Sequence, residues 1–137
     1  FKKNRSRYYE LLNNVRIKGD FEEWIEFFIQ GICEVSEDAI MSIQKIVELK
    51  KNDMDQIRLF SKGNMSNLLA VYDYLLKHPF LEAGDVKDLL DLSKPTISKI
   101  LDNLMELGIL ELVEEKKRYR QYVYKKYVDI LSEGTAL

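Results

Sequence analysis

Most of the hydrophobic positions in the first half of the chain recur at helical spacing. Residues 8–15 place apolar side chains every three or four positions, and Gly19 is positioned to end this helix in a left-handed conformation. The same spacing resumes at Trp24 and continues without a proline to about Phe60. The pattern predicts a first helix followed by one long helix or two shorter ones.

A polar segment, Ser61–Asn64, interrupts this pattern, and Asn64 is a residue type that caps helices. We therefore predict a domain boundary here, with one domain at 1–62 and a second at 63–137. The next helix should stop before Pro79, because a residue that precedes proline is pushed out of helical geometry.

A short helix, a tight turn, a longer helix and a hairpin should follow in that order. Asp85 can cap the short helix, whereas Ser93 can cap the longer one, with Pro95 in its first turn and Gly108 as its stop. The β-branched and aromatic stretches 109–113 and 119–124 predict a β-hairpin. A short closing helix is expected over residues 127–131.

This order of elements is typical of a winged helix-turn-helix domain, so the predicted fold is mainly α with a small β-hairpin. The second helix of such a pair presents its N-terminal end to the DNA major groove, and lysines and hydroxyls there can reach phosphates and base edges. The hairpin tip is also basic. The candidate DNA-binding residues are Ser93, Lys94, Thr96, Ser98, Lys99, Lys116, Lys117, Arg118 and Arg120.

The overall charge argues against a dedicated DNA-binding protein. The chain carries 21 basic and 23 acidic residues and has a net charge of −2. Asp102 and Glu106 lie further along the predicted recognition helix, where they would repel a DNA backbone unless they point away. The alternative function is a protein-interaction or dimerisation module that binds no nucleic acid.

Few residues are available for catalysis or metal binding. The single cysteine, Cys33, and the single histidine, His78, cannot form a His/Cys zinc site, so we assign no catalytic, cofactor-binding or metal-binding residue. Cys33 is expected to be a small buried residue of the long helix. The tyrosines of the hairpin region should pack half-buried against the helices; these are Tyr119, Tyr122, Tyr124 and Tyr127.

The apolar runs are only a few residues long, so we predict no membrane span and a cytoplasmic location. The chain begins at Phe1 rather than at a methionine, which suggests a fragment of a longer protein.

The segment Tyr8–Arg16 followed by Gly19–Phe28 resembles the C-terminal end of the Fic domain, although Phe21 stands where that family commonly has tryptophan. The segment from Leu92 to Arg120 resembles the winged helix attached to many bacterial Fic proteins. The resemblance implies a parent enzyme that transfers AMP from ATP to a target protein, with ATP and a divalent metal as cofactors.

The Fic catalytic motif requires a glycine-rich turn after His-Pro-Phe, and Leu81–Asp85 after His78-Pro79-Phe80 does not supply it. By this resemblance the catalytic domain would lie N-terminal to Phe1, and the fragment itself would not be an enzyme. Residues 1–60 would then expose apolar surface and drive self-association. The leading hypothesis is a winged helix that binds duplex DNA in a regulatory role.

Overall fold

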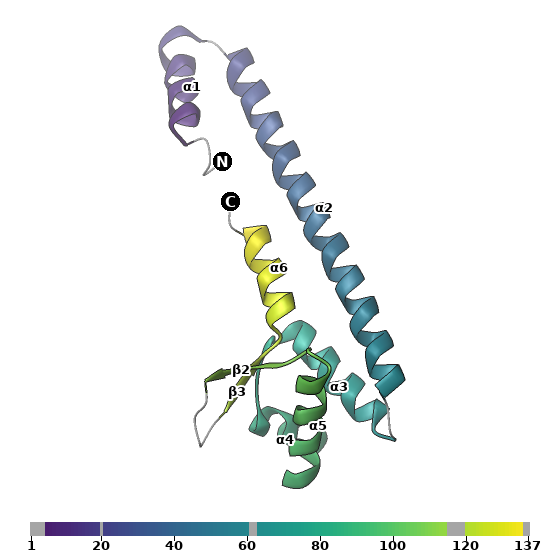
Figure 1. Cartoon of the computed structure of the whole chain (residues 1–137). Helices are drawn as coiled ribbons and strands as arrows, with labels where there is room; N and C mark the ends of the chain where they lie inside the picture. Colours follow the sequence, from purple (N-terminus) through teal and green to yellow (C-terminus); the bar gives the residue numbers. More distant parts are fainter. Residues whose placement is uncertain (1–4, 20, 61–62, 115–119, 136–137) are drawn as a thin grey trace. The chain divides into compact units, whose positions relative to one another are not determined.

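Helices make up most of the chain, and a small antiparallel sheet completes its second half (Figure 1). The computed structural model describes residues 5–19, 21–60, 63–114 and 120–135. The mainly α fold with a β-hairpin is therefore confirmed. The elements in chain order are α1 (Arg5–Lys18), α2 (Phe21–Phe60), α3 (Met65–Lys77), β1 (Phe80–Glu82), α4 (Ala83–Leu90), α5 (Lys94–Glu106), β2 (Glu111–Glu114), β3 (Gln121–Val123) and α6 (Lys125–Thr135).

The contacts divide the chain into two compact units, and the first comprises residues 1–44 with 132–137. Helix α1 ends at Gly19, whose φ of 67° is the left-handed conformation that the sequence predicted. Leu11 is buried, and the rings of Tyr8 and Phe27 lie 6.4 Å apart, so α1 packs against the beginning of α2.

Helix α2 is a single helix of 40 residues. Its last turns belong to the second unit, residues 45–131, so the division falls inside the helix rather than at the predicted boundary after residue 62. The division into domains 1–62 and 63–137 stays a prediction. The expectation for Cys33 was wrong, because this side chain is exposed.

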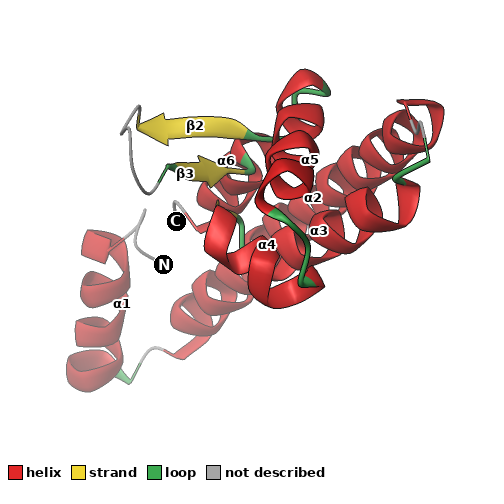
Figure 2. Cartoon of the chain, turned by 90° about the horizontal axis from the view of Figure 1, so that it is seen from below, coloured by secondary structure: helices red, strands yellow, loops and turns green. Residues whose placement is uncertain are grey.

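The second unit is built around helices α3, α4 and α5, with the β2–β3 hairpin extending to one side (Figure 2). Its core combines residues from these helices, from the sheet and from the end of α2, where Ile57 is fully buried. Tyr122 and Tyr124 are buried rather than half-buried as predicted, and Tyr119 lies outside the described residues. Tyr127 is half-buried, and its hydroxyl donates to the Leu76 carbonyl at 2.9 Å.

The sheet has three strands in the order β1-β3-β2, with both pairs antiparallel. Strand β1 was not predicted from the sequence. Its register pairs Phe80 with Val123 and Leu81 with Tyr122. Leu81 is buried while its neighbours are exposed, because successive side chains of a strand point to opposite faces of the sheet.

The predicted helix caps at Asn64 and Asp85 differ in the structure. The side chain of Asn64 makes no capping hydrogen bond at the start of α3. Helix α4 begins three residues earlier than predicted, with Glu82 as its N-cap, and the Glu82 N–H donates to the Asp85 carboxylate at 2.8 Å. Asp85 therefore closes the first turn from inside the helix.

Asp53 of α2 carries the one buried carboxyl group among the described residues, at 5% exposure. The Tyr72 hydroxyl of α3 donates to its carboxyl at 3.3 Å, and the Tyr124 hydroxyl, from the link between β3 and α6, donates to the same oxygen. The two hydroxyls are also 2.8 Å apart. This Asp53–Tyr72–Tyr124 cluster joins three segments that are distant in the sequence.

The surroundings of the cluster shift the pKa of all three of its groups. Burial raises the pKa of Asp53 above the ordinary 3.8, more than the tyrosine hydrogen bonds and Lys126 lower it. Burial also raises the pKa of both tyrosines, so they remain hydrogen-bond donors at neutral pH.

We expect Ile57→Ala to lower the free energy of unfolding by about 2–4 kcal/mol, because it opens a cavity in the winged-helix core. Leu59→Ala, at an 88% exposed position two residues further on, should change it by less than about 0.5 kcal/mol. Urea denaturation of both variants measures the difference. Equal effects would show that the end of α2 does not belong to this core.

Asp53 should make the folded state less stable as pH rises. Its folded pKa lies above the unfolded value, so between the two the folded state binds more protons and loses stability with increasing pH. Asp53→Asn cannot ionise and should flatten this fall. Unfolding free energies measured from pH 4 to pH 8 check the prediction, with the exposed Asp55→Asn as control. An unchanged pH slope in Asp53→Asn would contradict it.

Candidate nucleic-acid interface

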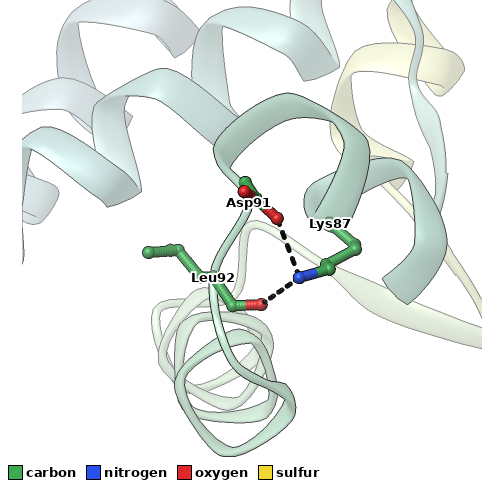
Figure 3. A network of polar contacts seen from close by, with 3 residues as sticks. All are labelled: Lys87, Asp91 and Leu92. Carbon is green, nitrogen blue, oxygen red and sulfur yellow. Dashed lines mark hydrogen bonds and ion pairs between the residues drawn. The ribbon is translucent and has the colours of Figure 1, made fainter.

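Helices α4 and α5 are joined by a three-residue turn whose geometry depends on Asp91. This residue has φ 49° and ψ 51°, a left-handed conformation at the C-cap of α4. Lys87 donates from its Nζ to the Asp91 carboxylate at 2.9 Å and to the Leu92 carbonyl at 3.3 Å (Figure 3). The lysine therefore ties the last turn of α4 to the turn that sets the direction of α5.

Helix α5 begins as the sequence predicted, with Ser93 as N-cap and Pro95 in the first turn. The Ser93 hydroxyl makes no capping bond to the backbone, and instead lies 2.8 Å from the Thr96 hydroxyl. Gly108, with φ 76°, follows the helix, and the Ile109 N–H donates to the Leu104 carbonyl at 3.0 Å. Both ends of α5 are thus fixed by local chemistry.

One face of α5 is buried and the other is exposed. Ile97, Ile100, Leu101 and Leu104 anchor the helix in the core. The five sequence-predicted contact residues of this region are all exposed and occupy the N-cap and first two turns; they are Ser93, Lys94, Thr96, Ser98 and Lys99.

The charge on the exposed face of α5 changes from positive to negative along the helix. Lys94 and Lys99 lie in the first two turns, whereas the exposed Asp102 and Glu106 lie nearer to the C-terminal end. The positive end of the helix dipole coincides with the lysines. A polyanion would therefore meet favourable charge at the N-terminal end of α5 and repulsion toward its C-terminal end.

The described part of the hairpin contributes one predicted contact residue, Arg120, which is exposed directly before β3. Lys116, Lys117 and Arg118 lie outside the described residues. Beyond β3, Lys125 donates to Asp129 at 3.0 Å, and this hydrogen bond raises the pKa of the lysine.

The Lys87–Asp91 contact was not predicted from the sequence. A lysine four residues before an aspartate signals a helical ion pair, but the left-handed conformation of Asp91 appears only in the structure. Within the described ranges, no three His, Cys, Asp or Glu side chains gather into a potential metal site. No stretch of the described helices combines the length and apolar character that crossing a bilayer requires.

Residues 69–130 match the family model described as "Sugar-specific transcriptional regulator TrmB". The match begins in α3 and ends in α6, so it contains the helix-turn-helix and the hairpin. No curated protein matches the chain.

Two solved structures show some similarity to this chain. The transcriptional repressor BigR from Xylella fastidiosa is 18% identical, with 69% of this chain and 95% of that chain covered and a TM-score of 0.39. The YusO protein from Bacillus subtilis is 16% identical, with 75% of this chain and 77% of that chain covered and a TM-score of 0.41.

The expected relation to the Fic family was wrong, because the matching family model describes a transcriptional regulator. The Fic interpretation depended on aromatic and acidic positions at the α1–α2 junction, a pattern that any amphipathic helix pair can produce. The missing catalytic domain, the AMP transfer, the ATP and the divalent metal rested on that resemblance alone and are not carried forward. The absence of enzymatic activity stays a prediction.

Substitutions at Asp91 should change the free energy of unfolding according to how easily the new residue adopts the left-handed conformation. Asp91→Ala should lower the free energy of unfolding by about 1 kcal/mol, because alanine is strained in this conformation and loses the Lys87 partner. Asp91→Gly loses the same partner but removes the strain, and should be at least as stable as the wild type. Urea denaturation compares the variants, and equal losses in both would rule out a strained left-handed residue.

Proposed function

We propose that the chain is a DNA-binding regulatory module whose winged helix contacts duplex DNA through the N-terminal end of α5. The observation that carries the proposal is the arrangement of α5, where lysines and hydroxyls occupy the exposed first two turns while four aliphatic side chains hold the helix in the core. The match of residues 69–130 to a transcriptional-regulator family model supports the same function.

In this proposal Lys94 and Lys99 neutralise phosphates, while Ser98 and the Ser93–Thr96 hydroxyl pair lie at the same helix end. The helix should enter the groove by its N-terminus, because Asp102 and Glu106 favour an orientation that keeps the later turns away from the backbone. Arg120, together with the predicted wing cations Lys116, Lys117 and Arg118, would contact the flanking phosphates.

Self-association through residues 1–60 is part of the proposal. Its support no longer includes an absent catalytic domain, and rests instead on the apolar side chains that α2 exposes. The second candidate function, an interaction module without nucleic acid, is favoured by the exposed Asp102 and Glu106 and by the net charge of −2.

Reversing the charge of both lysines, Lys94→Glu with Lys99→Glu, should weaken binding to labelled duplex DNA by about tenfold or more. If each lysine neutralises one phosphate, the slope of log affinity against log salt should also fall by about two. Fluorescence anisotropy titrations between low and moderate salt measure both quantities.

Lys50→Glu is the matched control, because Lys50 is an exposed lysine of α2 in the same compact unit and should leave both quantities nearly unchanged. Equal losses in the control and the double variant would indicate non-specific attraction. Absence of binding at low salt would overturn the proposal in favour of the interaction module.

A further inference from the structure

The N-terminal part of α2 exposes a row of apolar side chains on one side. Six of them are between 40% and 59% exposed, all inside the first compact unit. At 100° per residue they fall within about 140° of the helix circumference. We call this row the α2 stripe: Ile25, Ile29, Ile32, Val35, Ile40 and Ile43.

The first unit uses a different side of α2 for its own packing. Trp24, Phe27 and Ser42 are half-buried there, and they lie roughly 100–160° around the helix from the centre of the stripe. Phe27 approaches Tyr8 of α1, and a side chain at Gly134 of α6 would come within 2.9 Å of the Ser42 hydroxyl. The α2 stripe is therefore not the surface that holds this unit together.

The stripe is large enough for a stable interface. Each half-exposed side chain offers roughly 80–100 Å². With the exposed Phe21 and Phe28 beside it, the stripe offers on the order of 700 Å² per copy, close to one face of a standard protein interface. Patches of this size are uncommon on monomers.

The two ends of the stripe, Ile25 and Ile43, lie nine positions on either side of residue 34. In an antiparallel pair of α2 helices centred there, Ile25 faces Ile43 of the second copy. An interface between identical copies needs this self-complementarity. Glu34 itself lies about 180° from the stripe centre, so its carboxylate points away from the axis.

The charges of α2 favour the antiparallel arrangement over the parallel one. Glu22, Glu23 and Glu26 are exposed in its first two turns, and residues 21–44 contain no lysine or arginine. A parallel pair would bring these acidic turns to about 10 Å from each other. In the antiparallel pair the two Glu22 positions are about 36 Å apart along the axis, well beyond the screening length of about 8 Å at physiological salt.

We propose that two copies of the chain associate through the α2 stripe, with their α2 helices antiparallel and crossing beside residue 34. This inference rests on the self-association in the proposed function and specifies its surface and orientation.

Ile32→Asp places a charge at the centre of the stripe and should raise the dimer dissociation constant about 100-fold or more. Met41→Asp is the control. Met41 is 55% exposed, against 46% for Ile32, and nine residues place it about 180° around the helix. Sedimentation velocity of the full chain measures the change, and circular dichroism checks that both variants keep their helices. A monomeric wild type, or equal weakening by both substitutions, would overturn the proposed surface.

Cross-linking tests the orientation separately, in a Cys33→Ser background. Mixing differently tagged Ile25→Cys and Ile43→Cys chains should give cross-linked heterodimers with a short bis-maleimide, whereas either variant alone should not cross-link. Cross-linking within each variant alone would show a parallel dimer, which overturns the orientation but leaves self-association intact. Duplex binding by monomeric Ile32→Asp would show that DNA contact does not depend on the dimer.

Discussion

The buried Asp53–Tyr72–Tyr124 cluster is the constraint on which the second compact unit depends. Hydrophobic contacts alone would allow the end of α2 to slide or rotate over the winged helix, because aliphatic packing has little directionality. A buried carboxyl with two hydroxyl partners does not allow this, since any displacement leaves a polar group without its hydrogen bond. The cluster therefore fixes α2, α3 and the segment after β3 in one register.

Helix α2 has two roles in the structure. Its last turns complete the winged-helix core through Ile57, while its earlier turns expose the apolar stripe. The helix is continuous from Phe21 to Phe60. The predicted boundary after residue 62 would have separated the core from one of its own helices.

Local chemistry was sufficient to predict much of the fold. Gly19 and Gly108 end helices in the left-handed conformation, and Ser93 with Pro95 begins α5, as expected from residue type alone. Features that depend on distant partners were missed. Strand β1 has three residues and pairs with a strand some forty residues later, and the partners of Asp53 lie 19 and 71 residues away. The exposure of Cys33 was also missed, because helical spacing does not reveal which apolar side of a long helix meets its own chain.

The exposed lysines and hydroxyls at the start of α5 were predictable because that helix has strong start and stop signals. Their contact with DNA is tested most directly by hydrogen exchange of the full chain with and without duplex DNA at low salt. We expect slower exchange of backbone amides in residues 93–99 and no change in residues 25–43. Protection that is confined to other segments, or no protection at all, would contradict it.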